Sequence, residues 1–233
     1  MPKKRILLLA NSRKHQGNCL AGREIIGPVY GPGWIRPVSP RPGAEISLEE
    51  SKYDDGSQPR PFDVIDVPLV RAQPFGCHTE NWLISTADPW VKVAVASWDH
   101  VKLLAENPPS LWGTGSSTNN GFNDQLLESE AHNFDTSITL IHVDKVEIRV
   151  SVPGQNFGNP KVRVQARFHY NGAPYWLWVT DVDAEKYYVG QGKGVYQLGE
   201  CLLTISLAEA TSKPNAPGIR YHYKLVAAIN NRT

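Results

Sequence analysis

The chain has 233 residues, of which 41% are hydrophobic and 20% charged, a composition typical of a folded protein and not of a disordered one. Its 19 glycines and 18 prolines are scattered without a period, which favours many turns and short strands and excludes collagen. The net charge of +1 conceals an asymmetry, because residues 1–42 hold eight Lys/Arg and one acid, whereas residues 43–135 hold five Lys/Arg and fifteen acids. The basic segment is a candidate anion-binding face unless the acidic middle neutralises it in the fold.

Membrane and secreted classes are set aside on sequence grounds. No stretch approaches the roughly 18 apolar residues of a membrane span. The apolar run at residues 6–10 is too short for the core of a signal peptide and is better interpreted as a first strand. The three cysteines, Cys19, Cys77 and Cys201, are widely spaced and odd in number, which argues against a disulfide framework. We therefore expect a cytoplasmic protein without membrane association.

The first 88 residues are typical of four or five short strands. Residues 6–10, 33–39 and 62–70 have strand patterns, and residues 43–48 and a short piece near Cys19 complete the set. Trp34 and Arg36 share one face of their strand, and Pro37 places that strand at a sheet edge or at its own end. Short strands joined by Gly/Pro turns predict a small barrel or sandwich.

A different pattern begins at Asp88. This residue is a good N-cap, Pro89 suits the first helical position, and apolar residues at spacings of three and four continue to Leu104. This pattern predicts an amphipathic helix. Residues 111–136 are polar and rich in Gly, Ser and Asn, which predicts a long surface connection with one helical turn near residues 125–130.

The last hundred residues are again typical of strands. Residues 137–152 alternate along their length, and residues 161–170 place apolar side chains on one face and Lys, Arg, Gln and His on the other. Asn171-Gly172 is a strong hairpin signal, with residues 174–182 as the return strand. Residues 201–209 and 221–229 complete the set. The predicted fold is mainly β, with a barrel over residues 1–88, a helix and polar linker over 89–135, and a barrel over 136–233.

Three motifs with possible chemistry are weak. The glycine-rich segment 190–194 lacks the Ser/Thr and the following helix of a phosphate loop, so we interpret it as a hairpin loop. The cysteines and His78 match no zinc spacing, and we predict neither a metal site nor a cofactor. Asp181 and Asp183 could form a carboxylate pair, but the surrounding sequence favours a strand end that caps a short helix.

Basic and aromatic residues are interleaved in the first barrel. Such a mixture is typical of barrels that bind single-stranded nucleic acids, where a ring stacks on a base and cations neutralise phosphates. The alternative is that the tryptophans are core residues, because tryptophan is usually largely buried. We predict a phosphate-binding face of Arg13, Lys14, Arg23 and Arg36, with Trp34 as the stacking platform. The full set of candidate ligand-binding residues is Arg13, Lys14, Arg23, Trp34, Arg36, His78, Asn81, Trp82 and Lys224.

Five segments, ILLLANSRKHQGNCLAG, GWIRPVS, FDVIDVPL, HTENW and SLAEA…YHYKLVAAI, resemble the dual OB-containing domain family of bacteria. They follow the family's order over residues 4–229. The family usually ends in a compact Ser-Leu-Gly-Glu followed closely by His-Tyr-Lys-Leu, whereas here an alanine replaces the glycine and residues 211–219 are inserted. Glu209 and Lys224 match this pattern, but the insertion separates them.

The resemblance implies two oligonucleotide-binding-type barrels and a role in recognising nucleic acid or a nucleotide, often near prokaryotic conflict or defence systems. It brings no catalytic mechanism, and fold alone does not define function. We therefore expect a binding module for single-stranded nucleic acid or a nucleotide. The alternatives are a small nucleotide-acting enzyme that uses Asp181, Asp183 or His78, and an accessory protein that binds only another protein.

Overall fold

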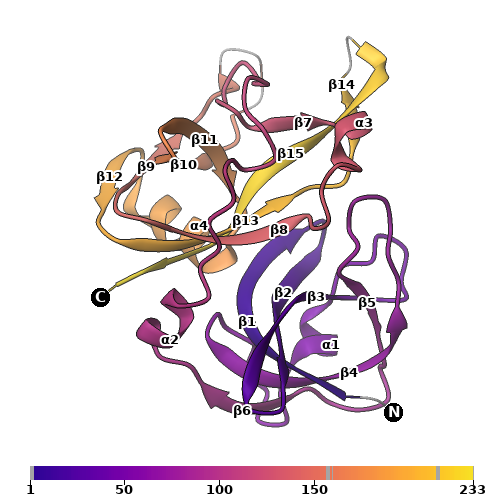
Figure 1. The fold of residues 1–233 in the computed structure, drawn as a ribbon. Coiled ribbons are helices and arrows are strands. Elements are labelled where there is room, and N and C mark those ends of the chain that lie inside the picture. The colour runs from indigo at the N-terminus through magenta and orange to yellow at the C-terminus, as the bar shows by residue number, and fades with distance from the viewer. Residues whose placement is uncertain (1–2, 156–157, 159, 214–215, 233) are drawn as a thin grey trace. The chain divides into compact units, whose positions relative to one another are not determined.

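The computed structural model describes residues 3–155, 158, 160–213 and 216–232. The chain divides into two compact units, one of Met1–Leu104 with Asp135–Ser137 and the other of Ala105–Phe134 with Ile138–Thr233 (Figure 1). The segment predicted as a linker is therefore shared between the two units. Within the described ranges, no helix has both the length and the apolar character that crossing a bilayer requires.

The first unit contains a closed five-stranded barrel. Its strands pair in the order β1-β2-β3-β5-β4, and β4 pairs with β1 to close the ring. The β3–β5 pairing is parallel and the others are antiparallel. This order, with a helix between the third and fourth strands, is that of the OB fold. The elements of this unit are β1 (Lys3–Lys14), β2 (Gly17–Ile26), β3 (Val29–Val38), α1 (Leu48–Ser51), β4 (Asp63–Ala72), β5 (Asn81–Ile84), β6 (Val91–Val95) and α2 (Trp98–Lys102).

Alternating apolar residues of these strands form the barrel core. Ile6 and Leu8 of β1, Leu20 of β2 and Ile35 of β3 pack in one buried cluster with residues of β4 and β5. The β1–β2 ladder shifts register near Leu8, and Gly22 lies opposite this point. A Cβ atom on Gly22 would lie 2.2 Å from the carbonyl oxygen of Leu7, so only glycine allows the two backbones to approach this closely.

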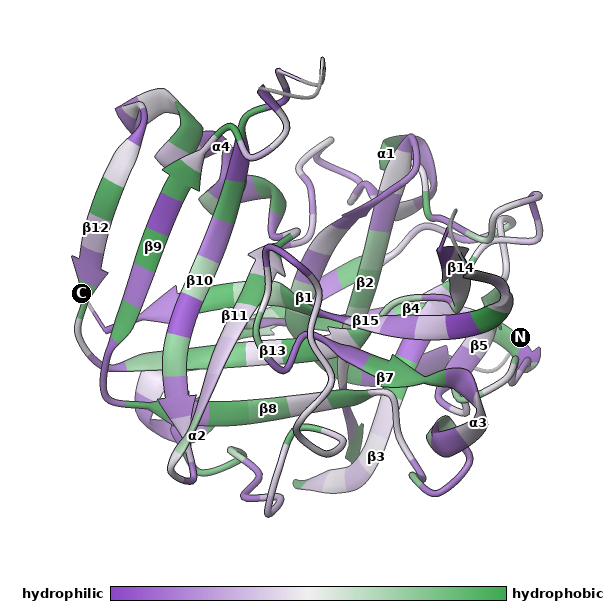
Figure 2. Cartoon of the chain, turned by 90° about the horizontal axis from the view of Figure 1, so that it is seen from above, coloured by the Kyte–Doolittle hydropathy of each residue, from purple (hydrophilic) through white to green (hydrophobic). Residues whose placement is uncertain are grey.

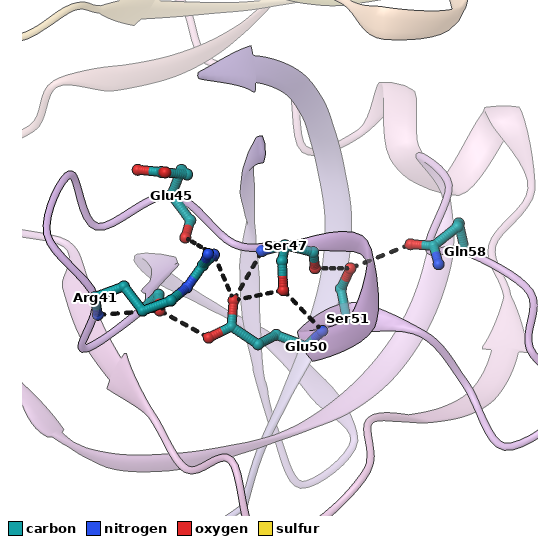
Figure 3. Close-up of polar contacts among 7 residues, drawn as sticks. Arg41, Glu45, Ser47, Glu50, Ser51 and Gln58 are labelled. Carbon is teal, nitrogen blue, oxygen red and sulfur yellow. Dashed lines mark hydrogen bonds and ion pairs between the residues drawn. The ribbon is translucent and has the colours of Figure 1, made fainter. Parts of the chain in front are cut away.

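The predicted strand at residues 43–48 is wrong, because this segment leads into α1. Only Ile46 makes an isolated bridge, to Asn18. Ser47 is the N-cap of α1: its hydroxyl accepts from the Glu50 backbone N–H at 3.2 Å, and the Glu50 carboxylate accepts from the Ser47 N–H at 2.8 Å (Figure 3). Burial raises the pKa of Glu50, but hydrogen bonds from Ser47, Ser39 and Arg41 outweigh it and lower the pKa below its usual range.

The helix predicted from Asp88 to Leu104 is also wrong. Residues Val91–Val95 instead form β6, which pairs antiparallel with β4, and a five-residue helix, α2, begins only after the N-cap Ser97. The β-branched valines at alternate positions suit a pleated strand, and the ladder with β4 outweighs the helical spacing of the apolar residues.

The second unit repeats the same strand order. Its sheet follows β12-β9-β10-β11-β15-β13-β8. Because β8 and β9 are consecutive halves of one strand, and β12 and β13 are halves of another, the two ends of this path join and the sheet closes as a five-position barrel. The β11–β15 pairing is parallel. In the chain, α4 lies between β11 and β12, just as α1 lies between β3 and β4 in the first unit. The elements are β7 (Gln125–Leu127), α3 (Glu128–Ala131), β8 (Ile138–Val143), β9 (Val146–Ser151), β10 (Arg163–Tyr170), β11 (Ala173–Val179), α4 (Val182–Gln191), β12 (Gly194–Leu198), β13 (Cys201–Leu207), β14 (Thr211–Lys213) and β15 (Ala216–Asn231).

Local signals in this half are largely confirmed. Asn171 and Gly172 both have positive φ, 48° and 78°, as a two-residue hairpin turn of the predicted kind requires. Asp181 is the N-cap of α4, as the composition of its segment indicated. The glycine-rich segment 190–194 is not a hairpin loop, because Gln191 ends α4 and Gly194 begins β12, with Gly192 in the left-handed region at φ 93°.

Candidate nucleic-acid interface

Two of the predicted first-barrel residues are buried. Trp34 and Arg36 lie on the face of β3 opposite the core residue Ile35, as the alternation predicted, but each is only 6% exposed. The guanidinium carbon of Arg23, on β2, lies 5.4 Å from the centroid of the Trp34 ring and covers it. The expectation that Arg36 is a surface cation is therefore wrong, because the face that carries it is enclosed.

Arg36 belongs to a buried polar network. Its guanidinium forms an ion pair with Glu80 at 3.0 Å, donates to the Ser137 hydroxyl at 3.0 Å, and contacts Nδ1 of His78. Ser137 also contacts the Glu80 carboxylate at 2.5 Å and His78 Nδ1 at 2.9 Å. All four side chains are buried. The network joins β3 to the segment before β5 and therefore has a structural role. Sequence reasoning did not identify Glu80 as part of it.

The other first-barrel candidates are scattered. Arg13 and Lys14 end β1 beside the hairpin to β2, and Arg13 is exposed. Asn81 is a buried residue of β5, opposite Arg36 in the β3–β5 ladder. Trp82 is half-buried against the barrel core, with the Lys4 ammonium 4.2 Å from its ring centroid. The structure does not gather these side chains with Trp34 into one exposed face.

Lys224 lies in the second unit and is 1% exposed. Its ammonium donates to the Gly113 carbonyl oxygen at 2.8 Å and lies 5.7 Å from the Tyr175 ring centroid. Burial lowers the pKa of Lys224 to about 8, although the charges of Asp124 and Glu130 act in the opposite direction. Lys224 therefore holds the loop that contains Gly113, and its side chain does not face solvent.

An exposed basic and aromatic surface lies instead on the second barrel. Gln197, Glu147, Arg167 and Trp176 are direct partners across four neighbouring strands, β12, β9, β10 and β11, and so form one row on the outer face. Since neighbouring strands are about 4.8 Å apart, the row spans about 15 Å. Figure 2 shows hydrophilic and hydrophobic bands alternating along β9 and β10, as expected for strands with one face in the core and one in solvent.

A second row lies two residues further along the same face. It contains Arg149 on β9 and Trp178 on β11, both opposite Gln165. Arg163, on β10, follows at the next outward position, with its guanidinium carbon 5.2 Å from the Trp178 ring centroid. We call these two rows, together with Arg163, the second-barrel face.

Phe122 adds a second exposed ring to this face. It forms an isolated bridge with Trp176, and the two ring centroids are 5.8 Å apart at an interplanar angle of 50°. Phe122 is 41% exposed and Trp176 is 36% exposed. The guanidinium carbon of Arg167 lies 4.1 Å from the Trp176 ring centroid. Trp176 therefore contacts both a phenyl ring and a cation, while part of its surface stays in solvent.

The loop that carries Phe122 is ordered by its own side chains. The Asp124 carboxylate accepts from the Thr118 backbone N–H at 2.7 Å and from the Thr118 hydroxyl at 2.6 Å. Asn123 accepts from the Gly115 N–H at 2.6 Å and donates to the Pro174 carbonyl oxygen at 2.9 Å, which ties the loop to β11. The polar segment predicted as a surface connection thus positions a ring of the candidate site.

The charges of the second-barrel face are only partly balanced. Among the described residues, Arg149 and Arg163 form no ion pair, and Glu147 approaches Arg167 only to 3.9 Å. Burial and the nearby charge of Arg149 lower the pKa of Arg167, and Glu147 partly offsets them. Like charges on neighbouring strands favour the binding of an anion, because a phosphate relieves their repulsion.

A cavity of about 630 Å³ lies over the first row. Besides the four residues of the row, its lining includes Asp144 and Lys145 from the bend between β8 and β9, and His169 from β10. Its size is within the range of small-ligand sites. The cavity combines an aromatic ring, cations and carboxylates.

Sequence reasoning missed this surface, although one signal could have found it. A two-residue Asn171-Gly172 turn fixes the β10–β11 register, which makes Arg167 the partner of Trp176. The outward positions of residues 161–170 were already recognised as basic. Asp181, one of the residues named for the enzyme alternative, accepts from the backbone N–H groups of Ala184 and Ile229 and caps α4.

Two barrels of one strand order in a single chain define a protein of the OB class with a duplicated fold. The sequence matches the dual OB-containing domain family over residues 4–229, and the chain belongs to that family. No match was found among curated proteins or among solved structures.

Proposed function

We propose that the second-barrel face binds single-stranded nucleic acid. The observation that carries this proposal is Trp176, which is exposed yet in contact with Phe122 and Arg167, on a face where Arg149 and Arg163 form no ion pair with any described residue. Base stacking on aromatic rings and phosphate neutralisation by arginine are the two interactions that sequence-tolerant single-strand binding uses. The strands concerned, β10 and β11, are the second and third strands of the barrel, where OB folds commonly bind oligonucleotides.

Single strands are favoured over duplexes for a geometric reason. A base can stack on Trp176 only when its own face is free, whereas the bases of a duplex are stacked on one another. The arginines flank the rings instead of forming a separate basic patch, so one strand can contact both at once. In a prokaryotic defence system, to which the family resemblance points, such a module would supply recognition and another protein the chemistry.

The test is fluorescence anisotropy of the full chain with labelled 12-nucleotide single-stranded RNA and DNA, with a duplex of the same sequence, and with ATP and GTP. We expect single strands to bind more tightly than the duplex. The double variant Arg149→Ala/Arg163→Ala should weaken binding. Arg13→Ala/Lys14→Ala removes the same charge from the first unit and is the matched control.

The outcomes separate the candidates. If Arg13→Ala/Lys14→Ala loses affinity and Arg149→Ala/Arg163→Ala does not, the site belongs to the first-barrel face predicted from the sequence. Absence of binding to every oligonucleotide would exclude the proposed function and favour a protein partner. Turnover of ATP or GTP would favour the enzyme alternative.

A further inference from the structure

The cavity beside Trp176 contains carboxylates as well as cations, and carboxylates accept hydrogen bonds that a phosphate ester does not donate. Asp144 and Glu147 line it together with the cations Lys145 and Arg167. Resting on the single-strand binding proposed above, we infer that this cavity selects guanine among the four bases, with Glu147 as the residue that reads it.

The first step is stacking. The Arg167 guanidinium covers one side of the Trp176 ring at 4.1 Å, and a guanidinium plane can itself stack on a nucleobase. Next to the base that stacks on Trp176, a further base stacked on the outer side of Arg167 would extend the row. This position brings the edge of the base toward β9, the strand that carries Glu147.

The second step is hydrogen bonding by Glu147. Its Oε2 atom accepts from the Gln197 amide at 3.3 Å, and its Oε1 atom lies 3.9 Å from Nη1 of Arg167, so the carboxylate is held in place between two strands. A carboxylate only accepts hydrogen bonds and has free lone pairs beyond these contacts. It therefore needs a ligand edge with N–H donors.

Guanine meets this requirement best. It presents two neighbouring donors, N1–H and N2–H₂, which match the two oxygens of one carboxylate. Uracil and thymine present one N–H between two carbonyl oxygens, which a carboxylate repels. Adenine and cytosine present one amino group beside an acceptor nitrogen. Guanine also has the acceptors O6 and N7, which suit a lysine such as Lys145.

The experiment measures four single-stranded RNAs that differ only in one central base, U₅-X-U₆, by anisotropy with the full chain. We expect the guanine oligonucleotide to bind about 5- to 150-fold more tightly than the all-uracil one, the range for a good two-bond base contact. Glu147→Gln should remove most of this preference. The same variant should strengthen binding of the all-uracil oligonucleotide, because it removes a negative charge from the face.

Asp144→Asn is the matched control, since it removes the same charge from the same cavity. It should strengthen binding of all four oligonucleotides and leave the guanine preference unchanged. Equal affinity for the four bases, with binding intact, would overturn the inference and leave the proposed function standing. A preference that survives Glu147→Gln, or that Asp144→Asn also abolishes, would overturn the role of Glu147. Absence of binding to all four RNAs and to the single-stranded DNA of the first test would remove the proposed function and this inference together.

Discussion

The Arg167 guanidinium carbon lies 4.1 Å from the Trp176 ring centroid, and the two residues are direct partners in the β10–β11 ladder. Phe122 contacts the same ring from the loop before β7. The ring is therefore ordered before any ligand arrives. Because little side-chain freedom remains to be lost, stacking on it costs less entropy than stacking on a mobile ring.

Replacing Trp176 by Ala should weaken single-strand binding by about 1–3 kcal/mol, the contribution of one stacked base. The loss of stability should be smaller than for a core tryptophan, because 36% of the residue is exposed and Leu177 beside it supplies the core contact. Anisotropy and thermal unfolding measure the two effects. Trp176→Phe keeps a ring and should retain most of the affinity. Unchanged binding by Trp176→Ala in a folded protein would contradict the stacking role.

Salt dependence tests the arginines separately from the rings. Each phosphate contacted on a single strand contributes about 0.7 to the slope of log affinity against log salt. Arg149→Ala/Arg163→Ala should reduce the magnitude of this slope by about 1.4 if each side chain contacts one phosphate, whereas Trp176→Ala should leave it unchanged. Binding titrations at four salt concentrations give the slopes. Parallel slopes for the double variant and the unmodified chain would mean that these arginines contact no phosphate.

The fold was predictable because its signals are local. Short strands, Gly/Pro turns and the Asn171-Gly172 hairpin indicated two β-barrels, and both are present. The failures at residues 43–48 and 88–104 have a common cause, since pairing partners far away in the sequence decide between strand and helix there. Val91–Val95 is a strand only because β4 offers it an edge.

The binding site was harder to predict than the fold. Alternation correctly placed Trp34 and Arg36 on one face, but it does not say whether that face is covered, and both are buried. In the second barrel, Arg167 and Trp176 could have been paired from the hairpin register alone. Phe122 could not, because its approach to Trp176 depends on a long polar loop whose path is set by tertiary hydrogen bonds.

The buried network around Arg36 leads to a stability prediction. Arg36→Ala should destabilise the first unit by about 3–5 kcal/mol, because it leaves the Glu80 carboxylate buried without its cation. Denaturant unfolding measures this loss. Arg5→Ala, which breaks an exposed ion pair with Asp66 in the same unit, is the control and should leave the unfolding midpoint almost unchanged. Equal effects of the two variants would argue against the network.

Lys224 gives a pH-dependent prediction. Its pKa is about 8 in the folded chain and 10.5 ordinarily, so between these values the unfolded chain binds more protons. The cost of burying the charge is therefore complete below pH 8 and is relieved as the pH rises toward 10.5. Lys224→Met removes this cost. Its stability relative to the unmodified chain should fall by about 2 kcal/mol from pH 7 to pH 9.5.

Comparing the two proteins at each pH cancels the titration of other groups, such as Cys201, whose pKa burial raises to about 12. Denaturant unfolding at pH 7, 8, 9 and 9.5 supplies the free energies. A difference that stays constant over this range would show that the Lys224 ammonium titrates at its ordinary value.

The loop that presents Phe122 can be disturbed without touching either ring. A Cβ atom on Gly121 would lie 1.8 Å from Oδ2 of Asp124, the oxygen that accepts from the Thr118 hydroxyl. Gly121→Ala should therefore displace this carboxylate, loosen the loop and move Phe122 away from Trp176. We expect single-strand affinity to fall while the cooperative unfolding of the barrel persists, because the loop lies outside its five strand positions.

The control for this change is Gly190→Ala. Gly190 lies within α4 with open space around its Cβ position, so alanine should stabilise the helix by about 0.5–1 kcal/mol and leave binding unaltered. Anisotropy and thermal unfolding of both variants give the comparison. If Gly121→Ala binds single strands as well as Gly190→Ala does, the ordered loop is not needed for the site, and Trp176 with its arginines must hold the strand without Phe122.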